Sequence, residues 1–387
     1  LIDSVRGANK ILFSNSTSQQ GSYSNTLTSF DNNGFTLGAD ATNLVNYDTK
    51  TYVAWCWKGG GDPVSNTDGT IDSQVSANTN AGFSIVSWTG NGNSASTVGH
   101  GLSSVPEMII TKSTSETNDW NVNHVAIPNK IVYLQGVNAA FSGGGTNGAF
   151  GYQSTNTATT FQFTAGSSGV NNVNKSSQQY IAYCFHSVDG FSKIGSYTGN
   201  GSSNGPFVYT GFKPAFVMLK RTDAGSSNWF IIDNARKNIN PNGAYLLPNA
   251  SNSENDLTAY SLEFFSNGYK LNSSDVQMNA NNGTYIYMAF AEDPVKYSNG
   301  VATLGDGNEF IQDGNYPEDN FAAEAYTGNG VSGREIITGY KPDLVWIKAR
   351  SQSFYHFWFD SLRVGDGTSD YHIVSSATGS EGTVGEL

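Results

Sequence analysis

Acidic side chains that could act as a catalytic pair lie close together at one place in the sequence, at Glu318, Asp319 and Glu324. A retaining glycosidase needs two carboxylates about 5 Å apart, and on a β-sandwich both often come from one strand. The Glu-x-Asp-x-x-Glu spacing that would place two acids in this way does not occur in the chain. We therefore expect no catalytic residues and no enzyme, with a polysaccharide depolymerase as the least favoured alternative.

The histidines show no metal-binding pattern. They are His100, His124, His186, His356 and His372, scattered along the chain at spacings that zinc sites do not use. No phosphate-binding loop, nucleophile elbow or dinucleotide fingerprint accompanies them. We interpret all five as structural histidines.

Two turns rich in Asp and Gly could supply oxygen ligands to a hard cation. They are NTDGTID at 66–72 and LGDGNEF at 304–310. Neither has the spacing of a calcium-binding loop, and Asp-Gly turns also close hairpins. We expect no cofactor and no metal site, and the sequence leaves Ca²⁺ open.

The composition excludes several classes of partner. The net charge is −12, from 20 basic and 32 acidic residues, and no run of Lys or Arg occurs. Nucleic acid is therefore not expected as a partner, because binding its phosphates needs clustered cations. No apolar stretch approaches the roughly 20 residues that span a bilayer, so membrane insertion is not expected either. The first residues, LIDSVRGANK, lack an initiator Met and a signal-peptide pattern and read as the start of a fragment.

The elements that must position any site recur three times. An aromatic residue followed by Thr-Gly-Asn-Gly occurs at 88–92, 197–201 and 326–330. Each copy is followed by a Pro that enters an apolar strand, and an uninterrupted apolar run occurs at 51–58, 179–186 and 284–291. The period of about 110 to 130 residues is the size of a small domain.

Short strands separated by Asn/Gly turns predict the fold. Two near-identical segments, 30–38 and 264–272, contain Asn-Gly, which is typical of a type I′ hairpin. We expect an all-β chain of tandem antiparallel β-sandwich (jelly-roll, concanavalin A-like) domains with little helix.

The repeat boundaries predict six segments, in which the chain begins inside one domain and ends inside another. They are the C-terminal part of a first repeat (1–58), a linker (59–82), two complete β-sandwich repeats (81–189 and 190–293), a linker (294–320) and the N-terminal part of a further repeat (321–387).

Several residues occupy matching positions of the repeats. Asp and Arg three residues apart occur as Asp3/Arg6, Asp233/Arg236 and Asp360/Arg363, which indicates a local ion pair that shapes a turn. Cys56 and Cys184 lie in equivalent strands, too far apart for a disulfide, and are expected to be buried free thiols. Trp120, Trp229 and Trp358 are interpreted as shared core residues.

Loops rich in Tyr, Asn, Ser and Gly are suited to ligand binding, because these residues offer broad contact area and adaptable hydrogen bonds. The loops after the repeated signature are the candidates. The residues expected to bind a ligand are Asn91, Asn200, Asn204, Tyr209 and Asn329.

Six longer motifs stand out along the chain: YTGNGSSNGPFVYTGFKPAFVMLKRTD, NWFIIDNAR, FFSNGYKLN, GTYIYMAFAEDP, TYVAWCWKGGG and FSIVSWTGNGNSASTVGHGL. In these motifs the chain resembles tandem-repeat, tail-fibre-like virion proteins of marine tailed phages (cyanophage and pelagiphage type). The resemblance implies concanavalin A-like or laminin-G-like sandwiches in a structural and adhesive component of a virion appendage, a tail fibre or surface fibre.

Further expectations follow from this resemblance. They are a position on the particle surface, recognition of host-cell surface glycans or another receptor, contact with other virion proteins, and a homotrimer. The alternative from another class is a ligand-free architectural spacer or capsid-decoration protein, whose loops would make subunit contacts.

Overall fold

The computed structural model describes residues 1–40, 44–142, 155–163, 173–291, 320–351 and 356–360. The helical segments in that part of the chain are short and include the single turns α1 (Val276–Asn279) and η2 (Thr258–Tyr260). The strands pair antiparallel, except for β1 (Ile2–Asp3) beside β29 (His356–Asp360). The expected all-β, antiparallel sandwich fold is confirmed.

Repeat 3 (191–291) shows the plan most simply, as an inner sheet and an outer sheet. The inner sheet has the order β17 (Ser192–Thr198), β25 (Thr284–Ala291), β19 (Pro214–Arg221), β20 (Trp229–Asp233). The outer sheet has the order β18 (Phe207–Tyr209), β24 (Gly268–Leu271), β23 (Leu262–Phe265). A separate pair is formed by β21 (Ala244–Tyr245) and β22 (Asn255–Asp256).

Repeat 2 (64–185) has a larger inner sheet. Its order is β14 (Phe141–Ser142), β13 (Lys130–Tyr133), β12 (Asn121–His124), β11 (Met108–Ser113), β16 (Gln179–Phe185), β9 (Phe83–Thr89), β8 (Ser73–Asn78), β7 (Val64–Asn66). The outer sheet is β10 (Thr97–Gly99) with β15 (Thr160–Gln162). Residues 59–82 are therefore not only the expected linker, because they supply two strands that extend the sheet.

Repeat 1 is built from both ends of the chain. Its inner sheet contains β26 (Phe321–Thr327), β6 (Thr51–Trp57), β28 (Leu344–Ala349), β29 and β1, and its outer sheet contains β27 (Arg334–Ile337), β5 (Gly34–Leu37) and β4 (Leu27–Asp31). Two short strands, β2 (Lys10–Ile11) and β3 (Gly21–Ser22), pair beside them. The expectation that 1–58 and 321–387 belong to two different domains is corrected: seven residue pairs join β26 to β6, so the two parts complete one sandwich.

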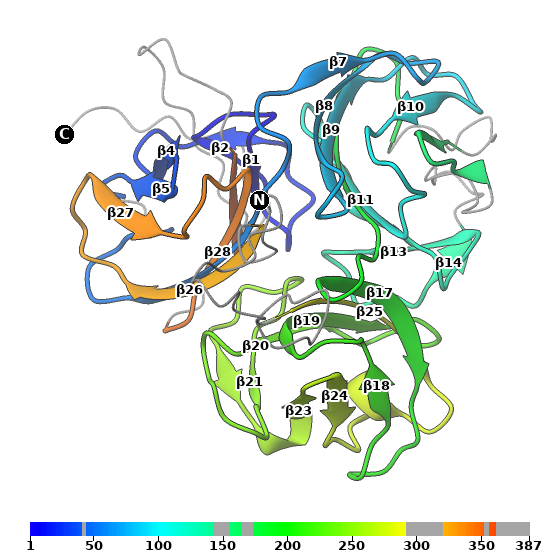
Figure 1. Cartoon of the computed structure of the whole chain (residues 1–387), viewed down its shortest axis with the longest axis vertical. Coiled ribbons are helices and arrows are strands. Elements are labelled where there is room, and N and C mark those ends of the chain that lie inside the picture. Colours follow the sequence, from blue (N-terminus) through cyan, green and yellow to red (C-terminus); the bar gives the residue numbers. More distant parts are fainter. Residues whose placement is uncertain (41–43, 143–154, 164–172, 292–319, 352–355, 361–387) are drawn as a thin grey trace, which may run out of the picture.

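The three repeats surround a shared core rather than forming a line, and they appear as three lobes in Figure 1. The closing strand of each repeat (β6, β16 and β25) connects that repeat to the shared core. Along β25, Ile286, Met288 and Phe290 pack into the shared core, while the alternate residues Tyr285 and Tyr287 pack into the core of repeat 3. The apolar run is uninterrupted because both faces of the strand are buried.

Equivalent aromatic residues meet at the centre of the molecule. The ring centroids of Trp57, Phe185 and Phe290 lie 5.6 to 6.3 Å apart in all three pairs. Around them, one main-chain hydrogen bond recurs at each boundary between repeats: Gln20 N–H to Thr114 O (3.1 Å), Ala140 N–H to Thr222 O (2.8 Å) and Glu254 N–H to Arg350 O (2.9 Å). The arrangement has approximate threefold symmetry within one chain.

A buried Asp accepts a hydrogen bond across two of these boundaries. The indole N–H of Trp55 donates to Asp233 at 2.9 Å, and the hydroxyl of Tyr183 donates to Asp3 at 2.5 Å. Both carboxylates also pair with the Arg three residues on, as expected. At the third boundary the corresponding residues are His124 and Met288, so the Asp and its donor are replaced together. The third expected pair, Asp360 with Arg363, involves side chains outside the described residues.

Two expectations about local structure need correction. The hairpin loops 32–33 and 266–267 contain no residue with positive φ, so they are not type I′ turns. The glycine after each loop is required by close packing instead, since a Cβ on Gly34 or Gly268 would lie 2.0 or 2.2 Å from a carbonyl oxygen of the neighbouring strand.

The second correction concerns Trp358. Trp229 lies opposite Lys220, whereas the residue opposite the equivalent Lys348 is His356. Trp358 is therefore two positions away from the equivalent site. Trp120 and Trp229 are fully buried core residues, and Cys56 and Cys184 are buried free thiols, as expected.

Candidate functional sites

The Thr-Gly-Asn-Gly signature folds back onto the segment that leads into the closing strand of its own repeat. In repeat 3, the N–H of Asn200 donates to Oδ1 of Asn279 at 2.7 Å, and Nδ2 of Asn279 donates to Oδ1 of Asn200 at 2.9 Å. The N–H of Gly201, whose φ is 67°, donates to the carbonyl of Asn279 at 2.9 Å. Asn279 is fully buried. The signature is therefore a clasp that holds two backbone segments together.

The clasp recurs in the other repeats. The N–H of Asn91 donates to Oδ1 of Asn174, and the N–H of Asn329 donates to Oδ1 of Asn46, both at 3.1 Å. The glycine before the Asn of each signature is required because the backbones approach closely there. A Cβ on Gly90, Gly199 or Gly328 would lie 2.2, 2.2 or 2.0 Å from a carbonyl oxygen. The repetition of the signature thus has a structural cause.

The five residues expected to bind a ligand do not form one site. Asn200 and Asn204 lie together, because Nδ2 of Asn200 donates to the carbonyl of Asn204 at 3.0 Å. Asn91 and Asn329 belong to the clasps of the other two repeats. Tyr209 is exposed on β18, on the outer sheet of repeat 3.

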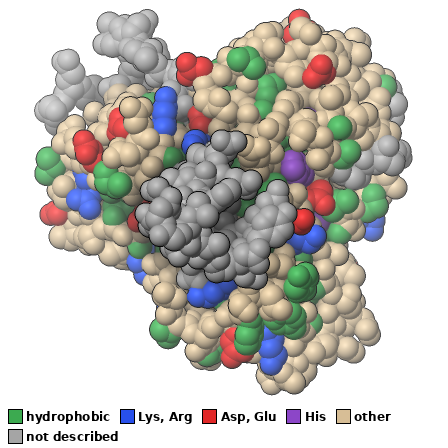
Figure 2. Space-filling view, viewed as in Figure 1, with side chains coloured by type: hydrophobic (Ala, Val, Ile, Leu, Met, Phe, Trp, Pro, Cys, Tyr) green, Lys and Arg blue, Asp and Glu red, His purple; other side chains and the backbone are tan. Residues whose placement is uncertain are grey.

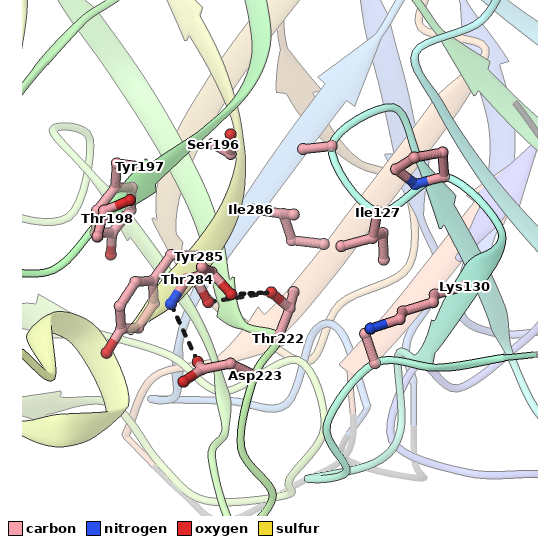
Figure 3. A pocket seen from close by; sticks show the side chains of 13 residues that line it. Ile127, Lys130, Ser196, Tyr197, Thr198, Thr222, Asp223, Thr284, Tyr285 and Ile286 are labelled. Atoms are coloured by element: carbon pink, nitrogen blue, oxygen red, sulfur yellow. Dashed lines mark hydrogen bonds between the residues drawn. The ribbon is translucent and has the colours of Figure 1, made fainter. Parts of the chain in front are cut away.

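A groove opens between repeats 2 and 3, and we call it the 2–3 groove. Its volume is about 320 Å³. Repeat 2 contributes the turn 126–128 and Lys130, and repeat 3 contributes residues at the ends of β17, β19 and β25. Figure 3 shows Thr222, Asp223 and Thr284 on the repeat 3 side, with Lys130 on the repeat 2 side.

Large side chains that fill another boundary have smaller counterparts here. Between repeats 3 and 1, Arg236 and Arg350 donate to the carboxylate of Glu254 at 2.9 and 3.0 Å and fill the space. At the positions of Arg236 and Glu254, repeat 2 has Ile127 and Ala140, as the strand register and the recurring main-chain hydrogen bond show. Neither side chain reaches across the boundary, and Thr222 stands at the position of Arg350, so a hollow remains.

Four serine and threonine residues line the 2–3 groove: Ser196, Thr198, Thr222 and Thr284. The hydroxyl groups of Thr222 and Thr284 lie 3.0 Å apart. Asp223 supplies the one carboxylate among the lining residues that the structure describes. It accepts from Nε of Arg221 at 2.9 Å and from the N–H of Thr284 at 3.1 Å, and the hydrogen bond from Arg221 lowers the pKa of Asp223. The lining can hydrogen-bond a polar ligand, whereas glycoside hydrolysis by paired acids needs a second carboxylate.

A related groove, the 1–2 groove, lies between repeats 1 and 2 and has a volume of about 360 Å³. Thr89 lines it at the position of Thr198, since Thr89 pairs with Gln179 as Thr198 pairs with Thr284. Arg6 lies in this groove and donates to Gln20 at 3.3 Å. The 1–2 groove therefore keeps the Arg that the 2–3 groove lacks and is open all the same. What the two grooves share is a Thr at the position of Arg350, Thr114 in one and Thr222 in the other.

Sequence reasoning missed both grooves because they form between repeats. One signal could have indicated both grooves. Two residues after Lys112, Lys220 and Lys348 stand Thr114, Thr222 and Arg350. The two boundaries with Thr at this position are open, and the one with Arg is filled.

The described histidines of repeat 2 have structural partners. His100 and His124 accept the backbone N–H of Leu102 and Ala126 at Nδ1, at 3.1 and 3.0 Å. Burial lowers the pKa of both imidazoles to about 4, so both are neutral at pH 7. Among the described ranges, no three His, Cys, Asp or Glu side chains are grouped so that they could hold a metal ion.

Of the two Asp/Gly turns, 66–72 lies within the described residues. There Nδ2 of Asn66 donates to Oδ2 of Asp68, and Oδ1 of Asn66 accepts the N–H of Asp68, both at 3.0 Å. The other turn, 304–310, lies outside the described residues, as do Glu318 and Asp319. Glu324 lies on β26, where burial raises its pKa.

Acidic and basic side chains are scattered over all three lobes on the face that Figure 2 shows, and no large patch of one sign forms there. In the described part of the chain, no helix has the length and apolar character needed to cross a membrane.

Comparison with known proteins finds a family model that covers most of the chain. A family model described as Domain of unknown function (DUF7483) matches residues 1–294 and 316–385. No curated protein matches the chain, and no solved structure matches it.

Proposed function

The chain belongs to this DUF7483 family. From the resemblance of its motifs to tail-fibre-like virion proteins, we propose that it is a structural and adhesive component of a phage virion appendage, a tail fibre or surface fibre, which binds host-surface glycans. The observation that carries the adhesive part is the 2–3 groove, a hollow of about 320 Å³ with hydroxyl groups on its walls. That volume is at the lower end of ligand sites, which suits one or two sugar rings.

The chemistry of the 2–3 groove supports a saccharide as its ligand. Hydroxyl groups such as that of Thr198 both donate and accept hydrogen bonds, as sugar hydroxyls do. Asp223 adds a charged acceptor and Lys130 a charged donor at opposite sides. Ala126 and Pro128, which are exposed, supply apolar surface for the C–H groups of a ring.

The number of grooves supports adhesion rather than strong binding at one site. The 1–2 groove gives the same chain a second polar hollow of similar volume. Weak contacts at several grooves, multiplied by the copies in an oligomer, give avidity without any single strong contact. We propose a homotrimer on the particle surface as the presenting form.

The experiment is a glycan-array and whole-cell binding assay with the full chain, presented as a multimer. Thr198→Trp places a bulky side chain in the 2–3 groove. Thr327→Trp is the matched control, because Thr327 ends β26 as Thr198 ends β17, at a boundary filled by Arg236, Glu254 and Arg350. We expect saturable binding that falls at least tenfold in Thr198→Trp and not in Thr327→Trp.

A second candidate function, a ligand-free spacer or decoration protein, is favoured by the clasps. Asn200 and its counterparts are exposed, yet their backbone and side-chain groups hydrogen-bond within their own repeat. A folded chain that binds no sugar and no host cell would favour this function over adhesion.

A further inference from the structure

Three aromatic rings on the outer sheet of repeat 3 project into solvent instead of into the core. The side chains of Phe207, Tyr209 and Phe265 are 47%, 65% and 41% exposed. The alternate residues of the same strands, such as Val208 and Phe264, are buried in the core of repeat 3. The outer sheet therefore has an apolar inner face and an aromatic outer face, where a polar one is usual for an antiparallel sheet.

The strand register brings these rings together around Gly268. Tyr209 and Phe265 lie on either side of Gly268, which pairs with both. The ring of Phe207 leans over the glycine, since a Cβ there would lie 2.8 Å from Cζ of Phe207. The centroids of Phe207 and Phe265 are 5.9 Å apart, with the rings inclined at 68°. We call the surface formed by Phe207, Tyr209 and Phe265 the aromatic face.

Charged groups border the aromatic face. Phe207 pairs with Lys270, and Lys270 pairs with Glu263, so one row across the sheet carries a ring, a cation and an anion. Lys270 and Glu263 are both partly exposed. A ligand on this face would meet the apolar surface of three rings and, at its edge, one hydrogen-bond donor and one acceptor of opposite charge.

Repeat 1 shows that the core does not require these rings. Its outer sheet has the same register, with Ile337 and Asp31 paired to Gly34 as Tyr209 and Phe265 are paired to Gly268. The inward positions stay apolar in both repeats, whereas the outward aromatic residues occur in repeat 3. Packing therefore explains the inward residues and leaves the aromatic face unexplained.

We infer that the aromatic face is a second binding site, which takes a pyranose ring of a neutral polysaccharide by stacking. The C–H face of a pyranose matches the electron-rich faces of the rings, and its hydroxyl groups can reach Lys270 and Glu263 at the border. The area favours this ligand over a second copy of the chain. The three rings expose roughly 300 Å² in total, at about 150 to 250 Å² for a whole aromatic side chain, whereas a stable protein interface needs about 800 Å² from each partner.

This inference rests on the proposed function for its class of ligand and adds a site separate from the grooves. The test is affinity electrophoresis of the full chain in native gels that contain galactomannan, mixed-linkage β-glucan or dextran. We expect retardation by at least one polysaccharide, with the apparent Kd raised about tenfold or more by Tyr209→Ala and by Phe265→Ala. Tyr209→Phe should keep the affinity within a few-fold, because stacking needs the ring and not the hydroxyl.

Ile337→Ala is the matched control, since Ile337 is an exposed residue opposite the equivalent glycine of repeat 1, and it should leave retardation unchanged. Thermal unfolding of each variant checks that it is folded. Retardation that is lost in Thr198→Trp and kept in Tyr209→Ala would overturn the aromatic face and support the 2–3 groove. Absence of retardation by all three polysaccharides, or a concentration-dependent dimer that Tyr209→Ala abolishes, would also overturn it.

Discussion

The rings of Trp57 and Phe290 lie 5.6 Å apart at the centre of the molecule, inclined at 71°, although they come from the first and third repeats. Both occupy the same position of their closing strands, and Phe185 of repeat 2 completes the set. One position of the repeat therefore builds the contact among all three repeats. This arrangement couples the stability of each repeat to the other two.

Trp57→Ala should lower the free energy of unfolding by about 3 to 5 kcal/mol, because it leaves a large cavity in the shared core. The wild-type chain should unfold in one transition, since the repeats share that core. Guanidinium unfolding, followed by fluorescence and by circular dichroism, measures the free energy of unfolding and the number of transitions. Tyr47→Ala, at an exposed side chain, is the control and should have little effect. Separate transitions in the wild type would contradict the coupling.

Trp55→Phe should lower the free energy of unfolding by about 1.5 to 3 kcal/mol, because the buried Asp233 carboxylate loses a hydrogen-bond donor. Tyr183→Phe should act in the same way through Asp3. Urea unfolding at pH 7 gives both values. A Trp55→Phe variant as stable as the wild type would show that the hydrogen bond to Asp233 does not stabilise the fold. Tyr47→Phe is the control, because it removes the hydroxyl of a ring that is partly exposed.

Much of the fold follows from the sequence because burial leaves a pattern in it. The run TYIYMAFA predicts a strand buried on both faces, and β25 is one. The pairing of β26 with β6 could not be predicted, because a repeat pattern shows that two segments are each incomplete and does not show that they complete each other. The closed arrangement depends on side chains such as Phe290 that meet only when all three repeats are in place.

The candidate sites were less predictable than the fold. Asn200 was expected to bind a ligand because Asn in a loop is suited to that role, but its amide and backbone N–H pair with Asn279 in a distant segment. The 2–3 groove depends on the small size of Thr222 and Ala140 relative to Arg350 and Glu254 at the filled boundary. Such a difference becomes meaningful only when the strand register shows which residues correspond. The sequence predicts Tyr209 as a ligand-binding residue, but it does not single out Phe207 and Phe265, which lie beside Tyr209 on the aromatic face.

The two thiols should be unreactive in the folded protein. Cys56 and Cys184 are fully buried, and burial raises the pKa of both well above the ordinary value. Because the thiolate is the reactive form, iodoacetamide at pH 8 should modify neither residue unless guanidinium is present. Mass spectrometry of the intact protein measures the labelling. Ser203→Cys places a thiol on an exposed loop as a positive control, and labelling of Cys56 or Cys184 at a similar rate would contradict their burial.

A lysine is buried at the same position of every repeat, and these lysines should give the protein a distinctive pH dependence. Nζ of Lys112, Lys220 and Lys348 donates to the carbonyl of the next residue, at 3.0, 2.8 and 2.7 Å. Burial lowers the pKa of Lys112 and of Lys348 to about 7, and that of Lys220 to about 8. Burying these side chains therefore costs stability at neutral pH, where the unfolded chain keeps them protonated at no cost.

Because the unfolded state binds more protons between the folded pKa of about 7 and the unfolded pKa near 10.5, stability should rise with pH across this range. Lys112→Met should stabilise the protein at pH 7 by roughly 2 kcal/mol or more, since one pKa unit corresponds to about 1.4 kcal/mol. The gain should shrink steadily toward pH 9.5, before exposed tyrosines of the unfolded chain ionise. Urea unfolding at intervals of pH measures this, with the exposed Lys213→Met as the control. An equal gain in stability at pH 7 and at pH 9.5 would show that the pKa of Lys112 is not lowered in the folded protein.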